Sequence, residues 1–243
     1  ILTSVYLSII GHETDKLNSL LENEIKSNIS NTEINLNKIK IKIDIKNLSF
    51  FATTLKPEIR YYNNKVKIKK IDAYIDLKSL FVGKPKINKI NISSSEVEVN
   101  EIKRIIKFQK PSNFKKFFLN NVNKGEITLK VDIDFKNNKI SNYEINGVVK
   151  NLFLSFQNFN LQKSSFIYLI NRKSVEINNI RGFINGFQVN SGNIIVDNSK
   201  KLNIKGDLNS DFNLSQKDIN QIVKNKTLKN LKKIELNGKA KGF

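Results

Sequence analysis

The chain has 243 residues and a formal net charge of +20, with 42 lysine and arginine residues against 22 acidic ones. Only four of the basic residues are arginine and the lysines are spread along the chain, whereas specific nucleic-acid sites favour arginine, whose planar group matches phosphates and guanine edges. The absence of cysteine excludes disulfides and thiolate metal sites, and the single histidine, His12, has no second ligand at metal-binding spacing. We therefore expect no bound metal and no nucleic-acid partner.

Residues 1–12 are predicted to be the end of an N-terminal membrane anchor. The first ten residues are mostly apolar and uncharged, but a helix that spans a membrane needs about 20 such residues. We therefore expect only the last part of an anchor here, and the alternative is an ordinary buried strand or helix end. The residues expected in the anchor are Leu2, Val5, Tyr6, Ile9 and Ile10.

Residues 13–30 are predicted to form an amphipathic helix. Thr14 can cap its first turn, and Asp15 suits the positive end of the helix dipole. The apolar residues recur at helical spacing on one face, at Leu17, Leu20, Leu21, Ile25 and Ile29.

From residue 31 onward, apolar and polar residues alternate in one short run after another. Ile39, Ile41, Ile43 and Ile45 alternate with charged residues, and the longest run extends from Ile127 to Phe135. A period of two residues is typical of a sheet with one apolar and one solvated face. Similar runs are centred on 66–68, 73–77, 90–92, 97–99, 145–149, 152–156, 175–177, 187–189, 194–196 and 202–204.

Two short helices are expected to interrupt these strands. Ser112 can cap the first, which carries Phe114, Phe117 and Phe118 on its apolar side, and Ser215 begins the second with a capping box. Because no linker rich in glycine, proline or serine divides the chain, residues 31–243 are predicted to be one continuous domain, cut at its C-terminal end. The fold class is mostly β: a long twisted antiparallel sheet, curled into an open groove or partial barrel.

No pattern in the sequence supports catalysis. The glycines are scattered rather than gathered in a phosphate-binding loop, and no serine lies in a nucleophile-elbow motif. Asp132 and Asp134 share one face of a predicted strand, but that face is the polar one, so a solvated surface is the better interpretation. We expect neither an enzyme nor a cofactor.

The stretch from Thr14 to Val99 resembles the N-terminal region of the AsmA-like envelope proteins, which include the YhdP and TamB types. The order is similar: a helix, a strand pair over 34–48, the segment Ile71–Leu77, a bend over 78–86 and a strand over 87–92. The resemblance implies a Gram-negative protein that one N-terminal helix holds in the inner membrane, with its bulk in the periplasm. It also implies phospholipid movement to the outer membrane, outer-membrane integrity as the role, and envelope proteins as partners.

A one-sided sheet with so little helix has to hide its apolar face by curling on itself. A trough that stays open would hold acyl chains of phospholipid. Two alternatives stay open: a structural or assembly β-solenoid of the envelope with a filled interior, and a basic nucleic-acid-binding protein. The residues expected to line the groove are Ile41, Ile43, Ile45, Ile75, Leu77, Leu129, Val131, Ile133, Phe135 and Val189.

Overall fold

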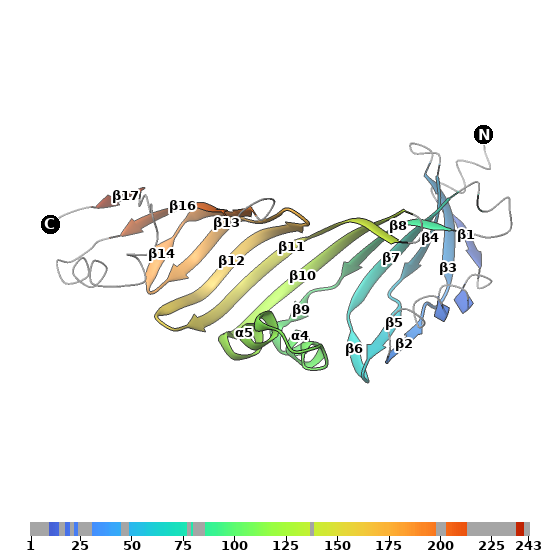
Figure 1. Cartoon of the computed structure of the whole chain (residues 1–243), viewed down its shortest axis with the longest axis horizontal. Helices are drawn as coiled ribbons and strands as arrows, with labels where there is room; N and C mark the ends of the chain where they lie inside the picture. The colour runs from blue at the N-terminus through green and yellow to red at the C-terminus, as the bar shows by residue number, and fades with distance from the viewer. Residues whose placement is uncertain are drawn as a thin grey trace.

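The computed structural model describes residues 10–14, 18–19, 22–23, 31–44, 49–76, 79, 86–136, 139–197, 203–212 and 237–240. Within these ranges the chain is mostly β, and its strands stand side by side along the long axis of an elongated molecule (Figure 1). The sheet does not close into a barrel, since its order begins at one strand and ends at another.

The large sheet has fourteen strands among the described residues. Its neighbours pair antiparallel, except for the last pair, which is parallel. Short strands β9 (Val97–Glu98) and β14 (Phe187–Val189) pair with the sides of β10 and β13. The spatial order of the others is β1 (His12–Thr14), β3 (Ile39–Asp44), β4 (Ser49–Leu55), β7 (Ile68–Ile75), β8 (Ile87–Ser94), β10 (Val122–Lys136), β11 (Lys139–Phe156), β12 (Phe159–Asn171), β13 (Ser174–Ile184), β15 (Ser191–Asp197), β16 (Asn203–Phe212) and β17 (Asn237–Ala240).

A second, three-stranded sheet packs against the N-terminal part of the large one. It consists of β2 (Thr32–Asn35), β5 (Glu58–Tyr61) and β6 (Asn64–Val66). Together the two sheets form a small core, whose buried members are Ile34, Leu36, Ile39, Ala52 and Ile75. The three-stranded sheet therefore covers the apolar side of β3, β4 and β7.

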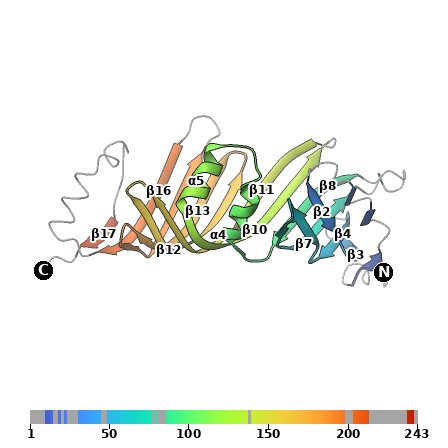
Figure 2. The ribbon, with the colours of Figure 1, turned by 90° about the horizontal axis from the view of Figure 1, so that it is seen from below.

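Two helices pack beside the middle of the large sheet, α4 (Val99–Ile106) and α5 (Asn113–Asn121), as Figure 2 shows. The hydroxyl oxygen of Ser112 accepts a 3.1 Å hydrogen bond from the backbone N–H of Lys115, which confirms the predicted cap. The helices contribute to a second core, whose buried members are Val99, Val122, Val149 and Leu152.

Irregular residues line up across four neighbouring strands of the large sheet. Gly125 in β10, Asn151 in β11, Lys163 in β12 and Asn179 in β13 all have positive φ, and the pairing register shifts beside each of them. A β-bulge bends its strand and increases the local twist. Aligned bulges in adjacent strands bend the sheet as a whole at this level.

Several predicted elements need correction. Val99 was expected in a strand with Val97, but it begins helix α4, so the strand ends at Glu98. Glu13 and Thr14 belong to β1, which pairs with β3, rather than to the predicted helix 13–30. Of that helix, residues 18, 19, 22 and 23 are described and are helical. The predicted helix that starts at Ser215 lies outside the described residues.

Candidate functional site

One face of the large sheet carries an unbroken line of paired residues, which we call the apolar row. Each member is the direct cross-strand partner of the next, and Thr54 is the one polar side chain among them. The row crosses ten strands from β3 to β16 and consists of Ile39, Thr54, Ile71, Ile92, Val131, Ile145, Ile170, Val175, Val196 and Ile204.

The apolar row runs along the long axis of the molecule, because cross-strand partners lie perpendicular to their strands. Neighbouring strands are separated by about 4.8 Å, so nine steps give a length of about 43 Å. That length exceeds the roughly 15 Å that one leaflet contributes to the hydrocarbon core of a bilayer. The part of the row beyond β7, from Ile92 to Ile204, takes six of these steps, or about 29 Å, and still exceeds that leaflet thickness.

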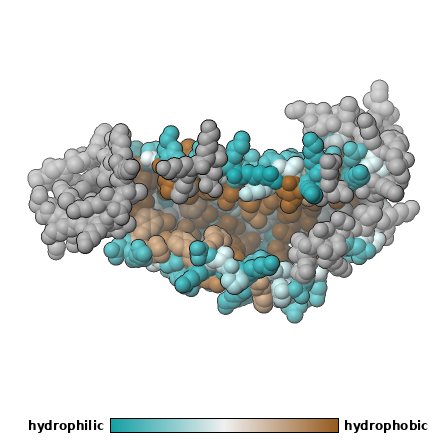
Figure 3. Space-filling model, in the orientation of Figure 1, coloured by the Kyte–Doolittle hydropathy of each residue, from teal (hydrophilic) through white to brown (hydrophobic). Residues whose placement is uncertain are grey.

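Exposure along the apolar row rises from the N-terminal end to the C-terminal end. Ile39 is fully buried beneath the three-stranded sheet, whereas Ile204 is 60% exposed. The members from Ile71 to Val196 are half-buried, so part of each side chain stays accessible. Figure 3 shows the result as a brown band of hydrophobic residues between teal margins.

From β3 to β11, the line of residues next to the apolar row on the opposite face is polar. The residues next to the apolar row are also cross-strand partners, and Lys40, Thr53, Asp72, Asn91, Asp132 and Glu144 follow one another from β3 to β11. Lys70 forms a 2.7 Å ion pair with Asp72 on this face. Burial, together with the carboxylates of Asp72, Asp44 and Asp132, raises the pKa of Tyr74 above its ordinary value.

Two elements limit the exposed part of the apolar face. At the N-terminal end the three-stranded sheet covers Ile39, Ala52 and Ile75. Along one margin the helices cover Val122 and Leu152 at the ends of β10 and β11. The uncovered part therefore extends from β8 toward β16.

The structure places eight of the ten predicted groove residues within described strands. Ile41, Ile43, Leu129, Val131, Ile133 and Phe135 are half-buried in β3 and β10, in the apolar alternation. Ile75 and Val189 are buried, with 6% and 5% of their surface exposed, so the expectation that they line an open surface is wrong. Ile75 is covered because it lies under the three-stranded sheet. Ile45 and Leu77 lie outside the described residues.

Most predicted anchor residues also fall outside the described part of the chain, namely Leu2, Val5, Tyr6 and Ile9. Ile10 lies in a turn and is 53% exposed. Among the residues that the structure describes, no helix is long and apolar enough to cross a membrane.

Sequence reasoning missed strand β12, which contributes Ile170 to the apolar row and Tyr168 beside it. Phe166 to Ile170 is a continuous apolar run, because Ile167 and Leu169 carry apolar side chains on the other face as well. The available signal was the run itself, since a short apolar segment bounded by polar residues is consistent with a buried strand.

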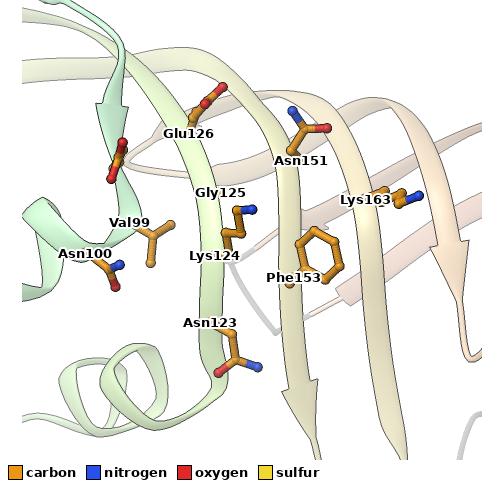
Figure 4. Close-up of a pocket in the computed structure, with 10 residues that line it drawn as sticks. Val99, Asn100, Asn123, Lys124, Gly125, Glu126, Asn151, Phe153 and Lys163 are labelled. Atoms are coloured by element: carbon orange, nitrogen blue, oxygen red, sulfur yellow. The ribbon is translucent and has the colours of Figure 1, made fainter.

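A pocket of about 500 Å³, to which most of the lining residues contribute polar side chains, lies where the aligned bulges meet the start of α4. Figure 4 shows Glu126, Asn151 and Lys163 on three neighbouring strands, with Phe153 farther along the strand that carries Asn151. Two lysines and two glutamates among the lining residues balance in charge. In the described part of the chain no three histidine, aspartate or glutamate side chains gather closely enough to hold a metal ion.

No family model, curated protein or solved structure matches the chain.

Proposed function

We propose that the chain binds the acyl chains of phospholipid along the apolar row, as the groove of a protein that moves lipid between two membranes. In this proposal the groove belongs to the periplasmic part of a protein that a single N-terminal anchor holds in the inner membrane. The groove passes phospholipid toward the outer membrane. The observation that carries the proposal is the apolar row itself, which crosses ten strands and stays half-buried from Ile71 to Val196.

Burial of hydrocarbon supplies the driving force. Each methylene group moved from water to an apolar environment gains about 0.8 kcal/mol. A sheet that covers only one side of an acyl chain gains roughly half of that, about 0.4 kcal/mol per methylene. Two long chains still gain enough to keep a lipid out of water, so lipid exchanges with a membrane rather than dissolving.

The shape of the sheet favours a groove. The aligned bulges at Gly125, Asn151 and Lys163 bend three neighbouring strands at one level. In this proposal the bend is toward the apolar face, so that the two margins of this face approach each other. A groove without specific polar contacts lets a lipid slide along its length, because every position offers similar apolar contacts.

The polar face argues against the nucleic-acid alternative. On this face Asp132 is the cross-strand partner of Glu144, and Asn91 stands between Asp132 and Asp72. Asp72 and Asp132 are ion-paired with Lys70 and Lys130, so charges of both signs alternate at the centre of this face. A nucleic-acid surface instead gathers unpaired basic residues. The scaffold alternative requires that other parts of the chain fill the space over the apolar row.

Lipid retention tests the proposal. The purified chain is mixed with phosphatidylethanolamine vesicles, separated from them, and assayed for bound lipid by mass spectrometry. Val131→Glu places a charge in the apolar row, and we expect it to reduce the bound lipid at least tenfold. The matched control Asp132→Asn changes the adjacent residue on the opposite face and should leave the bound lipid unchanged. Equal retention by both variants, or none by the parent chain, would overturn the proposal.

A further inference from the structure

The exposed aromatic side chains of the described residues gather on one margin of the molecule, which we call the aromatic margin. They belong to three segments: the β5–β6 turn, the α4–α5 hairpin and the β11–β12 turn. Figure 1 shows these three segments along the lower edge of the sheet. Their exposed aromatic residues are Tyr62, Phe108, Phe114, Phe156 and Phe159, and Phe114 is the most exposed at 67%.

Ring contacts join these segments into one surface. Tyr62 stacks on Phe108 with the ring centres 4.4 Å apart, which links the β5–β6 turn to the end of α4. Phe117 in α5 contacts Phe156 with the ring centres 5.3 Å apart, which links the hairpin to the β11–β12 turn. The aromatic margin is therefore built from elements that contact one another.

The hairpin at the centre of the aromatic margin is strongly basic. Residues 99–121 contain six basic residues, Lys103, Arg104, Lys107, Lys110, Lys115 and Lys116. The one acidic residue in this segment, Glu101, is already paired with Lys67 at 2.8 Å. Lys115 donates 2.6 Å hydrogen bonds to the carbonyl oxygens of Lys107 and Gln109, which fixes the turn between the helices.

We propose that the aromatic margin docks on the surface of an anionic lipid bilayer, with Phe114 inserted among the head groups. Aromatic rings beside lysines are typical of interfacial membrane contacts, where the rings enter the interface and the cations pair with anionic lipid. Charge complementarity favours this partner over a neutral bilayer. The hairpin has five lysines and one arginine. An anionic bilayer attracts basic residues through their total charge, whereas specific nucleic-acid sites rely on the planar guanidinium of arginine, so a bilayer fits this composition better.

Docking through this margin does not depend on lipid uptake by the apolar row, because it uses different residues on different elements. It would place the long axis of the sheet along the membrane surface, since the three segments lie along that axis (Figures 1 and 2).

Tryptophan fluorescence tests the docking directly, because the chain contains no tryptophan. Phe114→Trp supplies a single probe in the aromatic margin. Ile140→Trp supplies a matched control at the other end of β11, where Ile140 is 52% exposed. Each variant is titrated with phosphatidylcholine vesicles, with and without phosphatidylglycerol and with brominated lipid as quencher.

We expect the Phe114→Trp emission to shift to shorter wavelength and to be quenched by brominated lipid only when phosphatidylglycerol is present. The Ile140→Trp emission should not change. In the Phe114→Trp background, Lys110→Ala and Lys116→Ala should each weaken vesicle binding about fivefold. The proposal is overturned by equal responses at the two positions, by no response, or by a response to an RNA oligonucleotide without one to vesicles. If the vesicle experiment fails, the proposal that the apolar row binds lipid still stands. If the lipid-retention experiment fails, the proposal that the aromatic margin docks on a bilayer still stands.

Discussion

The hydroxyl of Tyr168 in β12 donates a 3.0 Å hydrogen bond to the backbone carbonyl oxygen of Thr128 in β10, across the strand that separates them. That strand is β11, and its residue beneath the ring is Gly147, the pairing partner of both Leu129 and Tyr168. A glycine is needed there because a Cβ atom would lie 2.7 Å from the Tyr168 hydroxyl. The contact therefore joins three strands at the middle of the apolar face.

Tyr168→Phe should lower the stability of the chain and change how that stability depends on pH. Removing the hydroxyl loses one hydrogen bond, for a loss of about 1 kcal/mol at neutral pH. Burial raises the pKa of Tyr168 to about 12, while an unfolded tyrosine has a pKa of about 10. Above pH 10 the unfolded chain releases this proton first, so stability falls as the pH rises from 10 to 12.

Urea denaturation of parent and variant at pH 7, 10 and 11.5 measures both effects. The fall in unfolding free energy above pH 10 should be smaller in Tyr168→Phe than in the parent. Tyr143→Phe is the control, because half-buried Tyr143 pairs with Ile133 in β10 and takes no part in the contact between Tyr168 and Thr128. It should change neither quantity. Identical alkaline profiles for all three proteins would contradict the burial of Tyr168.

Gly147→Val should destabilise the chain more than Tyr168→Phe does. The added side chain collides with the Thr128 carbonyl oxygen and with the Tyr168 ring, so backbone or ring must shift. Overpacking of this kind typically costs about 1–3 kcal/mol. The double variant Gly147→Val with Tyr168→Ala relieves the ring contact, so its stability loss should be smaller than the sum of the single losses. Additive losses in denaturation experiments would show that the two residues do not share this contact.

Ile39→Ala should loosen the three-stranded sheet from the large one. Ile39 is fully buried between the two sheets, and removal of a buried isoleucine side chain costs about 2–5 kcal/mol. Ile167→Ala is the control, since Ile167 is 43% exposed and should lose much less. Hydrogen exchange measured by mass spectrometry should rise over residues 32–35 and 58–66 in the first variant alone. Equal protection there in both variants would place the core elsewhere.

Ser112→Ala should loosen helix α5 without unfolding the sheet. The lost hydrogen bond to the Lys115 N–H is a helix cap, and a cap contributes about 1 kcal/mol. Ser112→Asp keeps an acceptor at the same position and should preserve the helix. Faster amide exchange over residues 113–121 is expected in the alanine variant. Similar exchange in the two variants would mean that the cap does not stabilise the helix.

The strands with strict alternation were predictable because the period of two survives from sequence to structure. Ile39 to Ile43 and Ile127 to Phe135 lie in β3 and β10 as expected. Strand β4 was missed because Phe50, Phe51 and Ala52 are consecutive apolar residues without alternation. Helix α4 was missed because Val97 and Val99, two residues apart, imitate the strand period.

The arrangement of the site depends on pairings that a single sequence does not contain. The apolar row exists because Ile92 pairs with Val131 and Val131 with Ile145, and these registers are set by long-range contacts. Ile75 is covered because β2 pairs with β5, although more than twenty residues separate these two strands in the sequence. Short polar strands such as these carry weak local signals, so sequence reasoning left Ile75 on an open surface.

Photo-crosslinking along the apolar row tests the central claim most directly. A photoreactive amino acid is placed at Val131 and Ile170 in the row, and at Asp132 and Asn146 on the opposite face, before illumination with phospholipid vesicles. Lipid attached at the first two positions and absent from the other two is the result expected of a groove that holds acyl chains. Lipid at all four positions, or at none, would contradict the claim that the apolar row binds lipid.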